Sequence, residues 1–262
     1  MVKEREFIYP KLNPQASLRL FCFPYAGGAA AAYYTWVNYL PADIEVCAVE
    51  LPGRGTRLQE RPLTSIESQV ELIFGGIHRH LDKPFAFWGH SMGSIIAFEL
   101  ARRLSRENGL LPAYLFASGR QAPHLPDKFP PAYNLPEPEL LHELRRLNGT
   151  PREVLDSPEL MQLMLPILRA DLQAIDTYPY SPGAPLECPI MALGGVRDAE
   201  VDSDGLEGWR EQTTDSFSIR MLPGDHFFLH TAQPLLLKII SQALQRIMTA
   251  RHGVQARQDA AS

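Results

Sequence analysis

Residues 85–93 read Phe-Ala-Phe-Trp-Gly-His-Ser-Met-Gly, and this stretch decides the fold. A short apolar run ends in the pattern Gly-x-Ser-x-Gly, and residues with helical periodicity follow at once. This context is typical of a nucleophile elbow, a sharp strand-to-helix turn that holds a serine Oγ at the top of a sheet. Glycine is needed on both sides because the turn brings backbone segments too close for a Cβ. Ser91 is therefore the candidate nucleophile, with an ordinary glycine-flanked turn serine as the alternative.

The composition is that of an ordinary globular protein. The chain has 262 residues, of which 45% are hydrophobic and 21% charged, and this length suits one large α/β domain or two small ones. The formal net charge of -5 argues against nucleic acid as a partner. Three widely spaced cysteines in apolar surroundings, without metal-ligand spacing, indicate reduced core residues. We expect no cofactor and no metal ion.

The ends of the chain and its hydropathy bear on location. The charged N-terminus lacks the apolar core of a signal peptide, and no apolar run approaches the ~20 residues that span a bilayer. We expect a cytoplasmic monomer without membrane association. The small, polar tail at about 250–262 is expected to be disordered.

Apolar runs alternate with helical segments along the chain. Strands are expected at 18–23, 44–49, 85–88, 114–117, 189–193 and 217–222, with helices at 66–81 and from residue 234. Several runs are continuously apolar, which is typical of parallel strands covered on both faces. Because neither a repeat nor a linker is visible, residues 1–262 are predicted to form a single α/β domain with a mostly parallel sheet and helices on both faces.

One stretch, at about 135–178, breaks this alternation because it carries helical signals without a strand. Residues 138–139 can begin one helix and residues 148–149 can end it, while residues 156–158 can cap a second helix with Pro166 inside it. An internal proline removes a hydrogen bond and bends a helix. Helices inserted over an active site commonly act as a lid, so we expect a helical lid here; an insertion that serves only stability is the alternative.

A serine nucleophile needs a base, and the base needs an orienting carboxylate. In this arrangement the partners follow the serine as acid and then histidine, on loops after later strands. The histidine directly after the last expected strand is His226, with His230 as its near competitor.

The loop after the preceding strand supplies the acid. Asp198 lies nearest the end of that strand and is preferred; Glu200, Asp202 and Asp204 are rivals on the same loop. Asp225 is excluded because adjacent side chains diverge.

The third requirement is an oxyanion hole. One donor is expected to be the backbone N–H of Met92, the residue after the nucleophile, and the other should come from the loop after an early strand. The loop Tyr-Ala-Gly-Gly at residues 25–28 fits, since its glycines let the backbone approach a substrate closely, and Ala26 is the preferred donor.

Together these residues resemble the type II thioesterases, discrete α/β-hydrolases that serve polyketide and nonribosomal peptide synthetases and vertebrate fatty acid synthase. The matching segments follow one another in the family's order, from about residue 17 to 248. They are residues 21–28 (Phe-Cys-Phe-Pro-Tyr-Ala-Gly-Gly), 51–54 (Leu-Pro-Gly-Arg), 83–94 around the elbow, 168–171 (Leu-Arg-Ala-Asp), the glycine pair 194–195 with Asp198, and 223–227 (Pro-Gly-Asp-His-Phe).

The resemblance implies hydrolysis of acyl thioesters from the phosphopantetheine arm of an acyl or peptidyl carrier protein, to remove stalled or aberrant acyl groups. It implies the same triad of Ser91, His226 and Asp198, the same oxyanion donors, and a flexible helical lid. Carrier domains are commonly acidic, so Arg54 and Arg57, with Arg61 and Arg120, are candidates for a carrier-binding rim. Scattered solubilising arginines are an equally good explanation.

Three other functions fit the same residues. An esterase or lipase acting on oxygen esters would use the same triad, and an acyltransferase would replace water by another nucleophile. A binding protein of hydrolase fold that has lost catalysis is disfavoured by the intact set of catalytic residue types.

Overall fold

The computed structural model describes residues 5–149 and 152–259. Seven strands in this part of the chain form one sheet in the order β1-β3-β2-β4-β5-β6-β7. All neighbouring strands are parallel except β1, which pairs antiparallel with β3. The strands are β1 (Phe7–Ile8), β2 (Leu18–Phe23), β3 (Ile44–Val49), β4 (Phe85–His90), β5 (Leu115–Ser118), β6 (Ile190–Gly195) and β7 (Phe217–Leu222).

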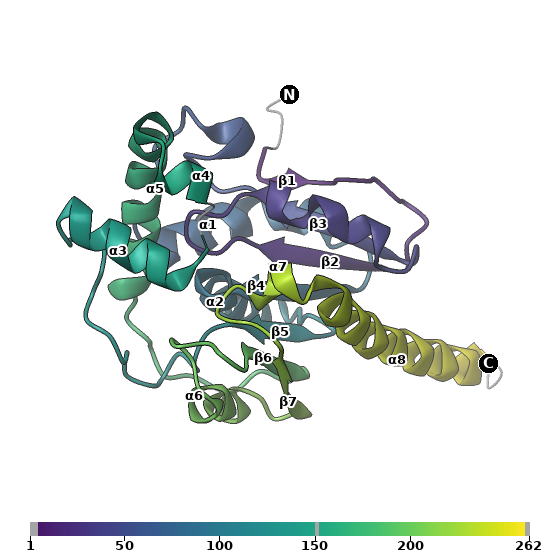
Figure 1. The fold of residues 1–262 in the computed structure, drawn as a ribbon. Coiled ribbons are helices and arrows are strands. Elements are labelled where there is room, and N and C mark those ends of the chain that lie inside the picture. The colour runs from purple at the N-terminus through teal and green to yellow at the C-terminus, as the bar shows by residue number, and fades with distance from the viewer. Residues whose placement is uncertain (1–4, 150–151, 260–262) are drawn as a thin grey trace.

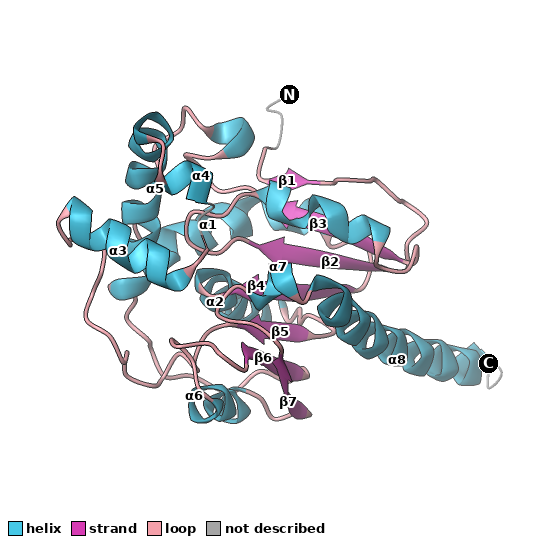
Figure 2. Cartoon of the chain, viewed as in Figure 1, coloured by secondary structure: helices cyan, strands magenta, loops and turns pink. Residues whose placement is uncertain are grey.

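Helices cover both faces of the sheet (Figures 1 and 2). The α-helices are α1 (Ile66–Ile77), α2 (Met92–Asn108), α3 (Glu137–Leu147), α4 (Arg152–Leu155), α5 (Pro158–Asp176), α6 (Ser203–Glu207), α7 (Phe228–Thr231) and α8 (Gln233–Asp259). The 3-10 helices are η1 (Ala30–Asn38), η2 (Gly55–Arg57), η3 (His78–His80) and η4 (Gly208–Gln212). Within the described ranges, no helix is long and apolar enough to cross a lipid bilayer.

The continuous apolar runs are explained by two cores, one on each face. Successive strand residues point to opposite faces, so Phe21 and Phe87 pack with α1 and α2. Their chain neighbours Cys22 and Trp88 pack on the other face with η1 and α8. Every residue of β2, β3, β4, β5 and β6 is buried as a result. This confirms the predicted α/β fold with a mostly parallel sheet.

Helices α3, α4 and α5 form the insertion expected between two strands, β5 and β6, and lie together beside the sheet (Figure 1). Asn148 ends α3 in the left-handed conformation, with φ 57°. The side chain of Ser157 caps α5 by accepting a hydrogen bond from the Leu160 amide. Pro166 lies inside α5. The insertion has its own apolar cluster, formed by Leu140, Leu144, Leu155, Met161 and Leu168.

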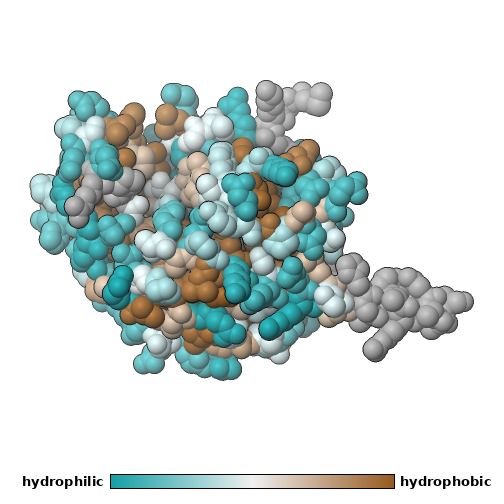
Figure 3. Space-filling view, turned by 45° about the vertical axis from the view of Figure 1, so that its right-hand side comes forward, coloured by the Kyte–Doolittle hydropathy of each residue, from teal (hydrophilic) through white to brown (hydrophobic). Residues whose placement is uncertain are grey.

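Some elements differ from the expectations. Strand β1 was not expected because two residues beside a charged terminus carry no periodic signal, yet Phe7 and Ile8 pair with Val49 and Ala48. The expected helix at 66–81 ends as an α-helix at Ile77 and continues as 3-10 helix η3. Helix α8 extends to Asp259, into the stretch at about 250–262 for which the sequence predicts disorder, and residues 260–262 lie outside the described part. The surface in Figure 3 intermixes hydrophilic and hydrophobic side chains.

Candidate active site

The elbow forms where β4 ends and α2 begins. Ser91 has φ 52° and ψ -117°, a strained conformation for a residue with a Cβ, of the kind that persists at functional sites. The glycines are required: a Cβ on Gly89 would lie 2.0 Å from the Gly93 carbonyl oxygen, and one on Gly93 would lie 2.4 Å from the Phe23 carbonyl oxygen. The Ser91 amide donates to the Ser118 carbonyl at 2.7 Å, which ties the turn to β5.

The structure brings His226 and Asp198 together. His226 follows β7, Asp198 follows β6, and the distance from His226 Nδ1 to Asp198 Oδ2 is 2.9 Å. The Asp198 side chain is 0% exposed, and its Oδ1 accepts a hydrogen bond from the Glu200 amide at 2.8 Å. A carboxylate at Nδ1 keeps the proton of a neutral imidazole on that nitrogen, which leaves Nε2 free to accept one.

Two of the rival acids, Glu200 and Asp202, have other partners, as does the excluded Asp225. Glu200 pairs with Arg146 of the insertion at 2.7 Å, and Asp202 caps α6 through the Gly205 amide at 2.9 Å. Asp204 lies in the first turn of α6. Asp225 accepts a hydrogen bond from Asn148 at 3.1 Å. These side chains do not compete with Asp198 for His226.

The competing histidine is also engaged elsewhere. His230 Nε2 lies 3.0 Å from the Tyr25 hydroxyl, and its ring stacks on Phe227. Burial lowers its pKa. His230 thus forms part of the wall beside the site.

The two expected oxyanion donors lie on the elements that the sequence indicates. Met92 is the first residue of α2, and Ala26 lies in the loop after β2. Among the described residues, neither backbone amide donates a hydrogen bond to another group of the protein. In the Ala26 loop, the Gly28 amide donates to the Tyr25 carbonyl at 2.8 Å, and Gly27 has φ +75°. Both amides are therefore available to a ligand.

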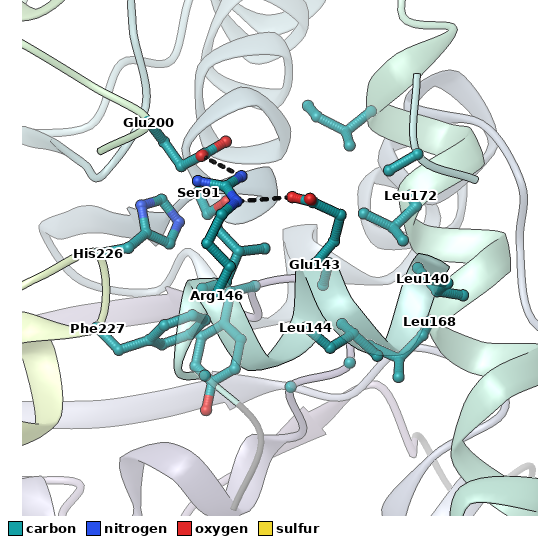
Figure 4. A pocket seen from close by; sticks show the side chains of 18 of the residues that line it. Ser91, Leu140, Glu143, Leu144, Arg146, Leu168, Leu172, Glu200, His226 and Phe227 are labelled. Carbon is teal, nitrogen blue, oxygen red and sulfur yellow. Dashed lines mark hydrogen bonds and ion pairs between the residues drawn. The ribbon is translucent and has the colours of Figure 1, made fainter. Parts of the chain in front are cut away.

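Ser91 and His226 line one cavity of about 1160 Å³ together with Ala26. The insertion lines one side of this cavity with apolar side chains of α3 and α5, among them Leu140, Leu144, Leu168 and Leu172 (Figure 4). Met164 of α5 also lines the cavity. Arg146 also lines the cavity and pairs with Glu143 and Glu200, both at 2.7 Å, as Figure 4 shows. A reacting group on Ser91 would therefore have a large, mainly apolar space beside it.

The expectation that Arg54 and Arg57 form an exposed rim is wrong. Arg54 is 3% exposed and Arg57 is 6% exposed. The Arg54 guanidinium is held by Asp171, with Nη1–Oδ2 at 2.7 Å and Nη2–Oδ1 at 2.8 Å. Arg57 Nη2 pairs with Glu60 at 2.6 Å, and its Nη1 donates to the Glu50 carbonyl at 3.2 Å. Both guanidinium groups are turned inward, so neither side chain is placed to contact a protein partner.

Two buried polar residues near the site had no role assigned from the sequence. Asp171 lies in one of the matching segments quoted above, but only the structure shows what its side chain contacts. His90, beside the nucleophile, is buried, and its Nδ1 lies 2.9 Å from Ser118 Oγ. Burial, with further effects from His226 and His230, lowers the pKa of His90 well below its ordinary value.

The sheet topology, the elbow and the histidine–carboxylate pair after the last two strands define the class: this is an α/β-hydrolase. Its sequence narrows the class further. The model of the Thioesterase domain family matches residues 18–244, and the chain belongs to this family.

The chain is similar to proteins of antibiotic biosynthesis and to thioesterases of fatty acid synthase. The chain is 44% identical to the gramicidin S biosynthesis protein GrsT of Aneurinibacillus migulanus over 245 residues, which cover 94% of this chain and 96% of GrsT. It is 34% identical to the medium-chain S-acyl fatty acid synthase thioesterase of Rattus norvegicus, with 83% of each chain covered. The solved structure of BorB, the type II thioesterase of the borrelidin cluster, aligns with a TM-score of 0.81 and 34% identity, covering 92% of this chain and 96% of BorB. Both sequence and structure therefore resemble the type II thioesterases.

Proposed function

We propose that this thioester hydrolase removes acyl groups from the phosphopantetheine arm of an acyl or peptidyl carrier protein, through Ser91, His226 and Asp198. The observation that carries the proposal is the 2.9 Å contact between His226 and Asp198, in a cavity that His226 shares with the strained Ser91. Relatives that serve gramicidin and borrelidin biosynthesis support a carrier-bound substrate and an editing role in polyketide or nonribosomal peptide synthesis.

In the acylation step, Ser91 Oγ attacks the thioester carbonyl carbon while His226 Nε2 takes the hydroxyl proton. The oxygen that becomes negative accepts hydrogen bonds from the Ala26 and Met92 amides. Preorganised donors of this kind lower the barrier by roughly 3–4 kcal/mol each. Asp198 stabilises the imidazolium through Nδ1. The carbon–sulfur bond then breaks and the pantetheine thiol leaves with the proton of His226.

In the deacylation step, water attacks the acyl-serine as His226 accepts its proton. The second tetrahedral intermediate collapses, the carboxylic acid leaves, and His226 returns the proton to Ser91 Oγ. The apolar side chains that α3 and α5 contribute to the cavity hold the acyl chain during both steps. The inserted helices act as the lid over this space.

The carrier docks at the mouth of the cavity rather than on Arg54 and Arg57. Leu58, Leu160 and Leu163 line the cavity and yet remain 46%, 44% and 58% exposed. Apolar side chains that line a cavity and stay exposed are candidates for an interaction site. They offer the pantetheine arm and the surface around its attachment point an apolar rim.

A comparison of two substrates tests the proposal. The same acyl group is presented as a thioester on a carrier protein and as an oxygen ester of similar size. We expect a higher kcat/KM for the carrier thioester, and loss of both activities in Ser91→Ala. A higher kcat/KM for the oxygen ester would assign the enzyme to the esterases, because the two substrates pass through the same type of intermediate.

A further inference from the structure

A carboxylate from the insertion reaches the oxyanion loop. Asp171 of α5 is 0% exposed, and its Oδ2 accepts a hydrogen bond from the Gly27 amide at 2.8 Å. The same carboxylate pairs with both terminal nitrogens of Arg54, at 2.7 and 2.8 Å. Arg54 Nη1 also donates to the Gly28 carbonyl at 3.0 Å. The ion pair thus binds one N–H and one C=O of the turn that carries Ala26.

Among the described residues, the backbone of this turn has few other hydrogen bonds. It is closed by one hydrogen bond, from the Gly28 amide to the Tyr25 carbonyl, and Gly27 supplies the positive φ that a turn of this type needs at its third residue. Glycine is conformationally permissive, so a turn with two glycines can pivot about them. The Asp171 contact fixes the peptide plane between Ala26 and Gly27, and the Arg54 contact fixes the plane that follows Gly28.

Helix α5 also packs against the turn through an apolar side chain. A Cβ on Gly27 would lie 2.6 Å from Leu168 Cδ2, so that glycine lets the helix approach closely. Leu168 precedes Asp171 by almost one helical turn, and both side chains therefore leave the same face of α5. The oxyanion loop and this helix form one packed unit.

Stability alone does not account for a buried ion pair. Replacing such a pair with apolar residues of similar volume is often neutral or stabilising, because two charges lose their hydration on burial. Here the two charged groups bind the backbone of the loop as well as each other. The Asp171 carboxylate accepts a hydrogen bond from the Gly27 amide. The Arg54 guanidinium donates one to the Gly28 carbonyl. We propose that Asp171, together with Arg54, is a positioning residue that aims the Ala26 amide at the thioester oxyanion and couples the oxyanion loop to helix α5. The inference rests on the proposed function because it takes Ala26 as an oxyanion donor.

The proposal predicts a change in kcat rather than in KM. The donor must meet the oxygen where charge develops, and misplacement by about 1 Å can cost about 100-fold in rate. Ground-state binding of the acyl chain depends on the apolar wall instead. Weakened anchoring of the turn should therefore lower kcat about 10- to 100-fold and leave KM nearly unchanged.

The main variant is the double substitution Arg54→Met/Asp171→Leu, which removes both charges without leaving one unpaired. Its matched control is Arg19→Met/Glu45→Leu, at a second ion pair. Arg19 and Glu45 are 5% and 1% exposed and lie 2.7 Å apart on β2 and β3, and neither lines the cavity. Both proteins are compared with wild type by kcat, KM, Tm and the affinity of an alkyl boronic acid, which forms a tetrahedral adduct with the serine.

We expect the Arg54/Asp171 variant to lose about 10- to 100-fold in kcat and a comparable factor in boronic acid affinity, with KM within about twofold. The control pair should change Tm without changing kcat. If the double variant does not fold, Asp171→Asn tests the positioning role instead. The side-chain carbonyl of the asparagine can still accept a hydrogen bond from the Gly27 amide, but the side chain no longer pairs with both terminal nitrogens of Arg54. We expect kcat to fall with KM unchanged.

Wild-type kcat in a folded Arg54/Asp171 variant, or an equal loss in the control pair, would overturn the positioning role. That result is separate from a failure of the proposed function. If wild type hydrolyses oxygen esters but not carrier thioesters, the proposed substrate is wrong, and the same variants then test the positioning role on the ester. If wild type hydrolyses thioesters and the Arg54/Asp171 variant keeps its kcat, only the positioning role fails.

Discussion

The substitution Asp198→Asn tests the proposal that Asp198 orients His226 as the catalytic base. Asp198 Oδ1 accepts the Glu200 amide at 2.8 Å, and Oδ2 lies 2.9 Å from His226 Nδ1. An asparagine at 198 would keep its carbonyl oxygen on the Glu200 amide, which turns its NH₂ toward His226. Nδ1 must then accept a hydrogen bond, so the ring proton moves to Nε2, and Nε2 can no longer take the proton of Ser91.

The opposite amide orientation does not rescue the variant. It would set the NH₂ group against the Glu200 N–H, which leaves two donors unpaired in a buried site at a cost of about 1–3 kcal/mol. The same change in the triad of a serine protease lowers kcat about 10⁴-fold, or about 5 kcal/mol of barrier at 1.36 kcal/mol per factor of ten. We expect a loss of this order here, with Tm nearly unchanged because the two side chains have the same shape.

The assay is kcat from release of the free thiol, measured for Asp198→Asn and for two controls on the same loop. Glu200→Gln breaks only a partly exposed ion pair with Arg146, worth at most about 1 kcal/mol, and Asp202→Asn keeps the cap of α6. Both controls should stay within about fivefold of wild type. A rate within tenfold of wild type for Asp198→Asn would refute the orienting role. A large loss in either control would move the acid to that residue.

Three further predictions concern the elbow, the buried histidine and the cavity mouth. Gly93→Ala places a Cβ 2.4 Å from a backbone oxygen and should lower the free energy of unfolding by about 4 kcal/mol or more. The control Gly75→Ala in α1, where the Cβ meets open space, should raise it by about 0.5–1 kcal/mol. Equal denaturation midpoints for the two variants would contradict this. The pKa of His90 is lowered in the folded state, so the neutral histidine contributes to the free energy of unfolding. This contribution is fully present above about pH 6.5 and is lost as the pH falls toward the folded-state pKa. The free energy of unfolding then decreases by up to about 1.4 kcal/mol per pH unit. Urea unfolding at pH 7.5 and 5.5 should therefore show a smaller loss in His90→Asn than in wild type, and parallel losses would refute the assignment. Leu163→Glu should raise KM for a carrier-bound substrate about fivefold, equivalent to about 1 kcal/mol, while Leu110→Glu, 39% exposed and away from the cavity, should not; equal effects would argue against docking at this mouth.

Chain order was sufficient to find the histidine and its carboxylate. Once Ser91 is placed on an elbow, the fold requires an acid and a histidine after later strands, and each of those two loops offers few candidates. Strand bounds were predicted closely for β2 and β3, because buried parallel strands read as largely apolar runs. The predicted bounds of β7 also agree with the structure, although this strand is only partly buried.

The direction of polar side chains could not be read in the same way. Arg54 lies in a loop rich in proline and glycine, where an exposed position is the ordinary expectation. Its guanidinium turns inward because Asp171, 117 residues further along the chain, is buried beside it. The tertiary packing of the inserted helices brings these two side chains together. A local sequence pattern therefore cannot predict the pairing. Strand β1 was not predicted because its two residues show no periodicity; they form a strand only through their pairing with β3.

The most direct test of the central claim is the mass of the enzyme during turnover of an acyl-carrier thioester. Rapid quenching followed by peptide mapping would locate any acyl group that has left the carrier. We predict an adduct with the mass of the acyl group on the peptide that contains Ser91, absent in Ser91→Ala, together with the free thiol on the carrier. Hydrolysis that persists in Ser91→Ala, or an acyl group found on another residue, would contradict the account.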